Sequence, residues 1–596
     1  MSDVQYSIRP HDPAGHLFEV SLTVSRPDPK GQQFNLPAWT PGSYMIRDFA
    51  RHIVGIDAWR DGAPVPLAKL DKQTWRAAPG SGPLMLRYRV YAWDLSVRAA
   101  HLDVTHAYFN GAAVFLAVRG QENQGSEVVI LPSEEGGEDW RVSTAMQAVD
   151  VDERGFGRYG VADYEELIDH PVEIGTQVSV SFTARGVPHE IALTGRLHPD
   201  TDTQRLAADM ERICARHIDL FGGQAPMDRY LFLIMVVGDG YGGLEHRASS
   251  SNMCKRDDLP RGGLDAPDEG YRNLLGLLSH EYFHSWNIKR IKPAAFVPYD
   301  LEREVHTELL WAFEGITSYY DDLGLVRSGV ISRESYLELL GRTITRVRRG
   351  SGRLKQTLTE SSFDAWTRFY KQDENAPNAI VSYYTKGALA ALCLDLTLRA
   401  GTGGACTLDT VMAELWRRHG VTGAGVPEDG LETLATELSG LEMGAFFDAL
   451  LRGTGDPPLE ELLDGIGVKL SWRAATGSSD PGGRAAERTP RSVLGARVLD
   501  ERGEARLAAV FEGGAAHRAG LSAGDAVIAV NGLRVSGANL EERVARFEPG
   551  DQFELWAFRR DELMRFQVSA QAPAPDTAVL TLREDADPEV LKGWLG

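Results

Sequence analysis

The sequence predicts a multidomain α+β protein with an N-terminal antiparallel β domain, a mostly helical central domain and a C-terminal β module. The chain has 596 residues, too many for one hydrophobic core. Apolar residues alternate with polar ones early in the chain, recur at helical intervals in the middle, and return to short strand-like runs near the end. With 43% hydrophobic and 25% charged residues, we expect all three parts to fold as ordinary globular domains.

The N-terminal β domain is expected over residues 1–198. In the stretch HLFEVSLTV, apolar residues stand at every second position from Phe18 to Val24, so one face of a strand is apolar. The alternation recurs over residues 84–90 and 178–182, with turn-rich segments between them. Strands that bury one face in this way are typical of an antiparallel sheet.

The central domain is expected over residues 199–458. Its first helix is predicted in RLAADMERICARHIDLFG and ends before Gly222 and Gly223. The run RYLFLIMVV is short, apolar and followed by GDGYGG, which predicts a buried strand that leads into a glycine-rich edge. From residue 268 to residue 451 the apolar spacing is mainly helical.

The C-terminal module is expected over residues 459–596. Residues 475–491, ATGSSDPGGRAAERTPR, are rich in Gly, Ser, Pro and Arg, and this composition predicts a flexible insertion. The apolar runs LAAVFE, AVIAVNG and FELWAFRR that follow predict short strands.

Charge and composition exclude several kinds of partner. The net charge of −21 disfavours nucleic acid, because such binding depends on basic contacts that release counterions. The N-terminus has no basic segment followed by an apolar core, and no run of eighteen apolar residues occurs. We therefore expect a cytoplasmic protein with no membrane partner. Four dispersed cysteines without a C-x-x-C pair are expected to be reduced and structural: Cys214, Cys254, Cys393 and Cys406.

The strongest chemical motif is HEYFH, which begins at His280. On a helix, His280 and His284 project from the same face one turn apart, so both imidazoles can bind one metal ion. H-E-x-x-H is the pattern of zinc peptidases, in which the glutamate, here Glu281, acts as the general base. The alternative is a structural helix that holds no metal.

A catalytic zinc site also needs a third protein ligand and an open position for water. The sequence favours Glu314, in ELLWAFEGITSYYDDL, because it lies among apolar and aromatic residues where a carboxylate needs a partner. His306 and Asp321 are weaker alternatives, and Glu314 on a helix surface is the structural alternative. The expected cofactor is one zinc ion, held by His280, His284 and Glu314.

Beyond this motif, the sequence resembles the glycyl aminopeptidase family of gluzincin (HExxH plus Glu) zinc metallopeptidases, distant relatives of the aminopeptidase N family. HEYFHSWNIKRIKP and WAFEGITSYY carry the resemblance in the centre, and LPAWTPGSYMIRDFARH resembles the family's N-terminal β domain. The resemblance covers nearly the whole chain. It implies a thermolysin-like catalytic domain and a zinc-dependent aminopeptidase that removes N-terminal residues, with glycine or alanine preferred, from peptide substrates.

The resemblance also implies roles for individual residues. GGLEHRASS matches the family's substrate edge, so Gly242 and Gly243 would lie along the peptide backbone and Glu245 would bind the free α-amine. His246 would be a fourth substrate-binding residue; it agrees with the glycyl aminopeptidase pattern but stands where aminopeptidase N relatives commonly carry asparagine. In SYYTKGALA, the family's Y-x-K-G segment falls on Tyr384, whose hydroxyl would donate a hydrogen bond to the oxyanion.

The C-terminal module resembles a PDZ domain through VFEGGAAHRAGLSAGDAVIAVNGLRV. PDZ domains add a peptide as a strand and hold its terminal carboxylate with loop amides, and that loop would contain Leu494, Gly495 and Ala496. The alternative is a module that only packs against the peptidase. Two other functions stay open: a zinc endopeptidase of the same fold, and a PDZ-bearing peptide-binding adaptor with an inactive protease fold.

Overall fold

The structure is a computed structural model of the chain in which residues 2–134 and 136–596 are described. They form two compact units, one of Met1–Val305 with Leu415–Val426 and one of His306–Glu414 with Pro427–Gly596. Within the described residues, none of the helices combines the length and apolar character that crossing a membrane requires.

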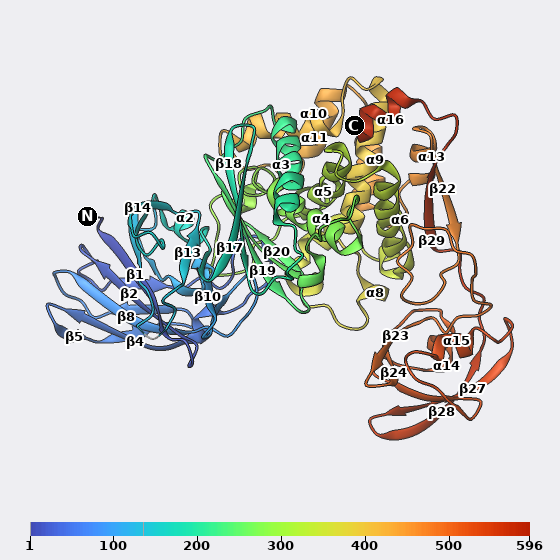
Figure 1. The fold of residues 1–596 in the computed structure, drawn as a ribbon, viewed down its shortest axis with the longest axis horizontal. Helices are drawn as coiled ribbons and strands as arrows, with labels where there is room; N and C mark the ends of the chain where they lie inside the picture. The colour runs from blue at the N-terminus through green and yellow to red at the C-terminus, as the bar shows by residue number, and fades with distance from the viewer. Residues whose placement is uncertain (1, 135) are drawn as a thin grey trace. The chain divides into compact units, whose positions relative to one another are not determined.

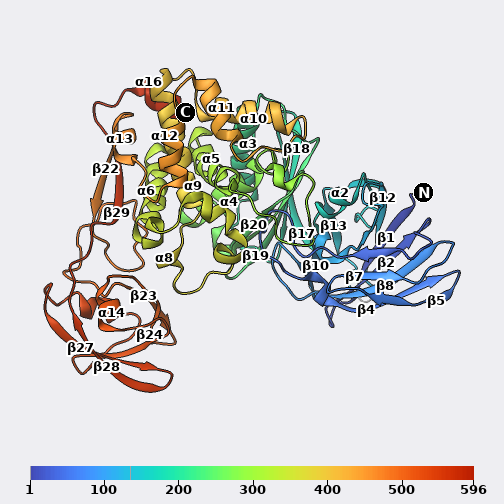
Figure 2. The same cartoon turned by 180° about the vertical axis from the view of Figure 1, so that it is seen from behind.

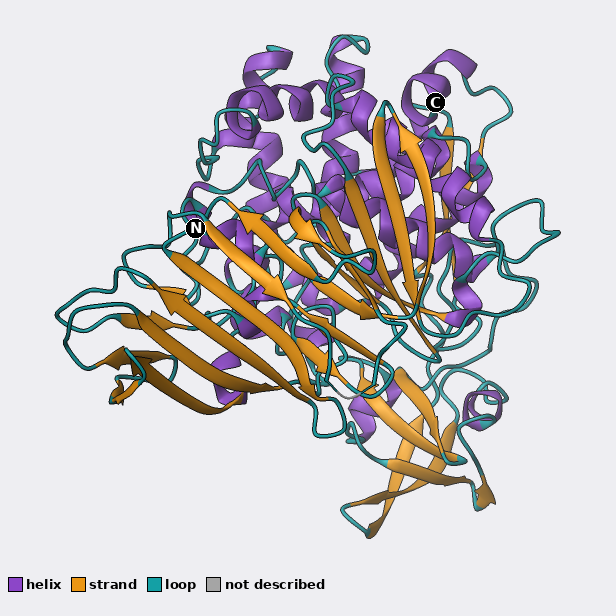
Figure 3. Ribbon diagram, turned by 60° about the vertical axis from the view of Figure 1, so that its left-hand side comes forward, coloured by secondary structure: helices purple, strands orange, loops and turns teal. Residues whose placement is uncertain are grey.

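The regular secondary structure in the first part of the first unit is mostly strands, drawn in orange in Figure 3. Its strands are β1 (Val4–Asp12), β2 (Leu17–Val24), β3 (Gln33–Asn35), β4 (Ile53–Arg60), β5 (Ala63–Val65), β6 (Leu67–Lys69), β7 (Thr74–Ala77), β8 (Leu84–Tyr91), β9 (Ala100–Leu102), β10 (His106–Phe109), β11 (Ala117–Val118), β12 (Ser126–Ile130), β13 (Arg141–Thr144), β14 (Gln147–Val151), β15 (Gly157–Val161) and β16 (Val172–Gly175), with short helices α1 (Gly111–Val114) and α2 (Tyr164–Ile168). They form three sheets, of orders β14-β15-β12-β1-β2-β8-β4-β5, β13-β16-β10-β9 and β11-β3-β7-β6.

The predicted alternation accounts for the core of the largest sheet. The register of β2 and β8 pairs Val20 with Tyr88 and Leu22 with Leu86, and all four side chains are buried. Each such side chain contributes about 1.5–3 kcal/mol when it leaves water. The N-terminal β-rich domain is therefore confirmed, although β1 and β12 in this sheet run parallel.

The fourth sheet of the first unit carries part of the candidate site. Its order is β17-β18-β19-β21-β20, and its strands are β17 (Gln177–Ala184), β18 (Val187–Thr194), β19 (Tyr230–Val237), β20 (Gly242–Glu245) and β21 (Ser249–Lys255). Helix α3 (Thr203–Leu220) contacts β17, and helix α4 (Glu269–Phe283) contacts β20 and β21 (Figure 1). The predicted helix and the predicted buried strand before GDGYGG correspond to α3 and β19.

Strand β17 differs from the sequence analysis, which groups residues 178–182 with the N-terminal sheet. It pairs instead with β18, and β18 runs parallel to β19. Alternation identifies the buried face of a strand but carries no information about its neighbour, so the pairing had to come from the tertiary structure. Val180 and Phe182 are buried as predicted, whereas Val178 is exposed.

The second unit is mainly helical before residue 465. Its helices there are α5 (Ile316–Arg327), α6 (Arg333–Arg349), α7 (Leu358–Phe363), α8 (Ala376–Ala379), α9 (Thr385–Thr402), α10 (Leu408–Leu415), α11 (Gly430–Ser439), α12 (Gly444–Phe447) and α13 (Leu459–Asp464). Helix α9 is buried over most of its circumference, as its apolar run ALAALCLDLTL predicts. Cys393 lies in that run, and all four cysteines are free and buried.

The C-terminal β module is a six-stranded sheet in which β26 pairs with β25 beside the order β23-β24-β25-β27-β28. Its elements are β23 (Ala496–Glu501), β24 (Glu504–Val510), α14 (Ala515–Ala519), β25 (Ala526–Val530), β26 (Leu533–Arg534), α15 (Leu540–Val544), β27 (Gln552–Arg559) and β28 (Glu562–Ser569). The three short strands predicted from the sequence are β24, β25 and β27.

The end of the chain does not belong to this sheet. The module is inserted between two strands of a ribbon, β22 (Val468–Arg473) and β29 (Thr577–Leu582), visible in Figure 2. Helix α16 (Pro588–Leu595) then packs against the helices of the unit, where Trp594 is fully buried and its Nε1 donates to the Tyr319 hydroxyl at 2.9 Å. The sequence analysis extends the module to residue 596 because α16 is too short a segment to separate by its pattern.

The first half of the predicted flexible insertion is held in place by hydrogen bonds. Asp480 accepts hydrogen bonds from Arg473 Nη1 at 2.6 Å and from the backbone amides of Thr476 and Gly482, each at 2.9 Å. Gly483 lies against α6, because a Cβ there would fall 2.3 Å from the Glu338 carbonyl oxygen. Composition indicates flexibility, but it does not reveal these tertiary contacts.

Candidate active site

Helix α4 carries the HEYFH motif and anchors it in the first unit. Asp268 caps the helix by accepting a hydrogen bond from the backbone amide of Tyr271 at 2.9 Å, and the four leucines of the helix are buried. The helix ends at Phe283, and His284 follows in helical conformation with φ −60° and ψ −17°. The ring centroids of His280 and His284 lie 4.6 Å apart. Both imidazoles therefore project together, as their spacing predicts.

His284 is held in the tautomer that a metal ligand requires. Its Nδ1 donates to the Asn287 carbonyl at 2.6 Å, which places the ring lone pair on Nε2, the nitrogen that would bind a metal ion. The turn that presents this carbonyl contains Ile288 with a φ of 118°, a strained conformation for a β-branched residue. Such strain is found where the surrounding structure fixes a functional geometry.

Glu281 lies against the glycine-rich strand β20. A Cβ added at Gly243 would fall 2.0 Å from Glu281 Oε1, so only glycine permits this approach. The Glu281 side chain is buried, at 5% exposure. Arg98 steadies the strand by donating from Nη2 to the Gly243 carbonyl at 3.0 Å. No motif in the sequence marks Arg98 for this contact.

Glu245 lies beside Glu281 and His284. Each of these three residues, Glu245, Glu281 and His284, has one potential metal-ligand atom within 4.8 Å of those of the other two. Glu245 is 3% exposed, and its Oε1 accepts no hydrogen bond from the described residues. Gly42, with φ 90°, approaches it from the N-terminal part, because a Cβ there would lie 2.4 Å from both carboxylate oxygens. A buried carboxylate in this state favours a cationic partner.

His246 lies beside a different pair of charged residues, Asp169 and Lys289. Its Nδ1 lies 3.4 Å from Asp169 Oδ1, and Lys289 Nζ lies 2.5 Å from the same carboxylate. Burial lowers the pKa of His246, although Asp169 opposes this shift. Burial alone would raise the pKa of Asp169, but Lys289 and His246 hold it well below its usual range. His246 thus belongs to a buried polar network beside β20.

In the second unit, Glu314 lies in the π-helical turn Trp311–Gly315 that leads into α5, and it is 2% exposed. This turn crosses α9 closely, because a Cβ at Gly315 would lie 2.5 Å from Gly387 Cα. π-helical turns are often found at functional sites. His306, a weaker candidate ligand, is exposed and its Nδ1 lies 2.8 Å from the Phe363 carbonyl.

Two adjacent tyrosines precede α9, and they differ in burial. Tyr383 is fully buried, and burial, with smaller effects of Tyr370 and Glu314, raises its pKa well above the usual value. Tyr384 is half-buried, and its hydroxyl lies 3.4 Å from that of Tyr370. Tyr384 is therefore the more accessible of the two tyrosines, and its contact with the oxyanion stays a prediction.

The predicted PDZ loop lies before an open sheet edge. Leu494 and Ala496 are buried, and Gly495, with φ 72°, packs against Gly514. β23 forms the edge of its sheet, and Leu499 on it is 47% exposed. An edge strand with unpaired backbone groups is able to accept an added peptide strand.

Replacing Gly243 by alanine tests the contact between β20 and Glu281. The new methyl group would displace a buried carboxylate, so we expect Gly243→Ala to lower kcat about 10²-fold for the peptide substrates expected from the sequence. Gly55→Ala is the matched control, because no atom lies within 4 Å of a Cβ at that position. Equal steady-state rates for the two variants would contradict the close approach.

A buried histidine behind α4 predicts the pH dependence of stability. His189 Nδ1 donates to the Val187 carbonyl at 2.8 Å, so Nε2 accepts from the Tyr282 hydroxyl at 2.9 Å. Burial lowers the pKa of His189 to about 4. Between that value and the unfolded value of about 6.5, the unfolded chain binds a proton that the folded chain excludes. The contribution of neutral His189 to the free energy of unfolding is therefore fully present above about pH 6.5 and is lost as the pH falls towards 4.

We expect this loss to reach about 2 kcal/mol at pH 5. Urea unfolding at pH 7 and pH 5 measures it, and His189→Gln should remove that part of the pH dependence. The exposed His198, changed to glutamine, is the control and should keep the dependence of the wild-type protein. The idea is wrong if His189→Gln and the wild type lose equal stability.

Family models match three parts of the chain. Residues 5–176 match the Peptidase M61 N-terminal domain, residues 273–390 match the M61 glycyl aminopeptidase, and residues 485–552 match the PDZ domain. No curated protein sequence gave a significant match.

The solved structures that resemble the chain include one with high sequence identity and others with low sequence identity. A crystal structure of an aminopeptidase N family protein from Idiomarina loihiensis is 42% identical, with a TM-score of 0.96 and 100% of both chains covered. An M1 zinc metallopeptidase from Deinococcus radiodurans is 15% identical, with a TM-score of 0.48 over 76% of this chain and 94% of its own. Aminopeptidase A of Legionella pneumophila is 13% identical, with a TM-score of 0.50 over 76% of this chain and 49% of its own.

The fold and its HExxH helix define a metallopeptidase of the aminopeptidase class. More closely, the chain belongs to the M61 glycyl aminopeptidase family and carries a PDZ domain. The family resemblance inferred from the sequence is confirmed.

Proposed function

We propose that this protein is a zinc-dependent aminopeptidase that removes single residues from the N-termini of peptides. The observation that carries the proposal is the place of Glu245, whose buried carboxylate lies within 4.8 Å of Glu281 and His284 and has an oxygen that accepts no hydrogen bond from any residue that the structure describes. A substrate ammonium group would satisfy this carboxylate. Because the first peptide carbonyl lies only one residue from that ammonium group, cleavage would follow the first residue.

His280, His284 and Glu314 would hold one zinc ion. Their donor chemistry fits this ion, since imidazole nitrogen and carboxylate oxygen are common zinc ligands in peptidases. The hydrogen bond from His284 Nδ1 to Asn287 and the burial of Glu314 in a π-helical turn support the assignment. When bound, zinc would acidify a water molecule and polarise the substrate carbonyl.

The protein's own residues would then supply proton transfer and binding. Glu281 would take the proton from the attacking water and deliver it to the leaving amine. Tyr384 would donate a hydrogen bond to the oxygen on which negative charge develops, a contact that strengthens in the transition state. Gly242 and Gly243 would let the substrate backbone lie close to β20. His246 would support β20 from the polar network around Asp169.

A preference for glycine or alanine at the first position is part of the proposal. It is supported by the family description, glycyl aminopeptidase. We further propose that the PDZ domain receives the C-terminal end of a peptide along β23, with the terminal carboxylate at Leu494, Gly495 and Ala496. The exposed edge of β23 supports this.

A peptide panel tests the activity. Peptides that begin with Gly, Ala, Leu or Arg, each with a free and an N-acetylated terminus, would be incubated with zinc-loaded protein and followed by mass spectrometry, with a chelator as control. We expect single N-terminal residues to be released only from the free peptides, and fastest for Gly or Ala. Internal cuts in acetylated peptides would instead indicate an endopeptidase. No chelator-sensitive cleavage would indicate a peptide-binding adaptor.

A further inference from the structure

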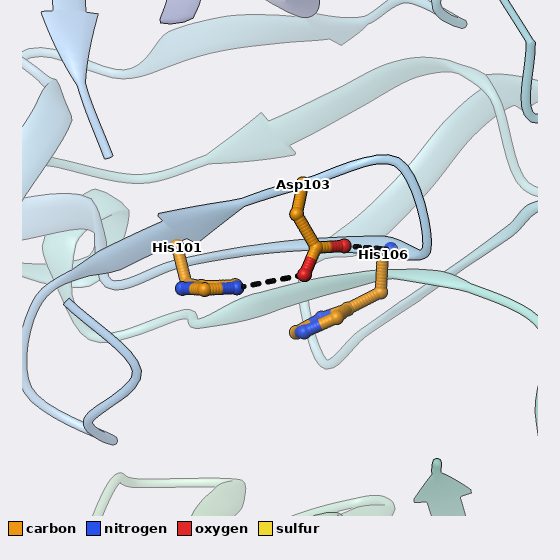
Figure 4. A group of neighbouring side chains, drawn as sticks. All are labelled: His101, Asp103 and His106. Carbon is orange, nitrogen blue, oxygen red and sulfur yellow. Dashed lines mark hydrogen bonds and ion pairs between the residues drawn. The ribbon is translucent and has the colours of Figure 1, made fainter. Parts of the chain in front are cut away.

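A second group of potential metal ligands lies in the first unit and shares no residue with the candidate active site. It consists of His101, Asp103 and His106, which form an H-x-D-x-x-H sequence in the β9–β10 hairpin. One ligand atom from each residue lies within 4.8 Å of the others. Figure 4 shows the three side chains turned toward one another on the same side of the hairpin. The hairpin therefore brings together three ligands within six residues of sequence.

The hairpin fixes the Asp103 carboxylate. Its Oδ1 accepts hydrogen bonds from the backbone amides of Thr105 and His106, at 2.6 and 3.1 Å, and from the Thr105 hydroxyl at 2.5 Å. These bonds leave Oδ2 directed at His101, whose Nε2 lies 3.3 Å away. A carboxylate oriented in this way is positioned to bind an ion beside His101.

The two histidines are buried and oriented. His101 and His106 are 5% and 6% exposed. His106 Nδ1 lies 3.0 Å from Glu173 Oε1, and Glu173, on β16, is itself buried. A carboxylate on one ring nitrogen is the usual support of a metal-binding histidine, because it directs the other nitrogen toward the ion.

The charges of the group favour a cation. Asp103 and Glu173 are both acidic, and no lysine or arginine in the described part of the chain forms an ion pair with either. The only positive charge that the group itself supplies is a protonated histidine. The imidazoles stack at 4.9 Å, so their simultaneous protonation would be unfavourable. A bound divalent cation would offset both carboxylates while both rings stay neutral.

We propose that His101, Asp103 and His106 bind a divalent first-row metal ion, with Glu173 as the support of His106. Two imidazole nitrogens and one carboxylate oxygen suit zinc and its neighbours, with water in the open position. The ion would tie β9 to β10 in the segment that follows Arg98, the residue that holds the Gly243 carbonyl. The site would therefore stabilise the part of the first unit that supports β20.

Metal stoichiometry tests the proposal on the full-length protein. Zinc-loaded protein would be dialysed extensively and its zinc measured by mass spectrometry. We expect two zinc ions per chain in the wild type, one in His284→Ala, one in His106→Ala and none in the double variant. His16→Ala is the matched control, because His16 lies near the hairpin, with Nδ1 2.7 Å from the Leu102 carbonyl, without belonging to the group. It should keep two ions.

A wild-type protein with one zinc ion, and a His284→Ala variant with none, would overturn the second site. Cobalt provides a readout that does not depend on folding of the hairpin variants: cobalt-loaded His284→Ala should absorb in the visible range, and a colourless protein would also overturn the proposal. If the assignment of His284 as a ligand fails instead, His284→Ala will keep the wild-type zinc content while His106→Ala still loses one ion. The two failures are therefore distinguishable.

Discussion

Glu281→Gln is expected to lower kcat by about 10²–10⁴-fold while the protein keeps its zinc. Glutamine has nearly the same size and shape, so it fits between α4 and Gly243, where the carboxylate now lies. It has no basic oxygen that can take a proton from water at neutral pH. Steady-state hydrolysis of a glycyl or alanyl substrate, together with zinc analysis of the same sample, measures both effects.

Glu269→Gln in the first turn of α4 is the control for this variant. Glu269 is exposed and lies three helical turns before the motif, so its loss should leave turnover unchanged. Turnover like that of the wild type in Glu281→Gln would remove the proposed role. A loss of zinc in that variant would instead make Glu281 a ligand, an outcome compatible with its place beside Glu245 and His284.

Much of the fold could be predicted because local patterns report local structure. The alternation around Val20 and Leu86 gave the strands of the largest sheet, and the apolar run before GDGYGG gave β19. The partner of a strand was harder to predict. The buried face of β17, for example, would suit either neighbouring sheet. Helix α16 was missed because it is short and is tied to the unit by tertiary contacts, among them the burial of Leu591, Trp594 and Leu595.

The candidate site likewise contains some residues that local sequence predicts and others that it does not. His280, Glu281 and His284 form a local motif whose spacing on one helix determines how they project, so sequence alone found them. Gly42 could not be found, because its role depends on a close approach to Glu245, about 200 residues later in the chain. The hydrogen bond that orients His284 is accepted by a backbone carbonyl, and a backbone group leaves no signature in residue types.

Glu245→Gln is expected to lower kcat/KM for peptides with a free N-terminus by about 10²–10³-fold. The change keeps the shape of the side chain and removes the charge that would pair with the substrate ammonium group. Glu245 is buried, so water cannot replace that ion pair well. Measuring kcat/KM for one peptide in its free and N-acetylated forms isolates the effect, because only the free form carries the ammonium group.

The ratio between the two peptides separates recognition of the amine from general damage to the site. In the wild type we expect strong preference for the free peptide, and in Glu245→Gln a preference reduced by the same factor as kcat/KM. Asp239→Asn is the control, since that exposed carboxylate lies in the loop before β20 and pairs with Lys255. If Glu245→Gln slows all substrates while the preference stays intact, Glu245 supports the metal site or the strand instead of the amine. Retained zinc would then favour the strand, because a ligand or its support cannot be weakened without loss of metal affinity.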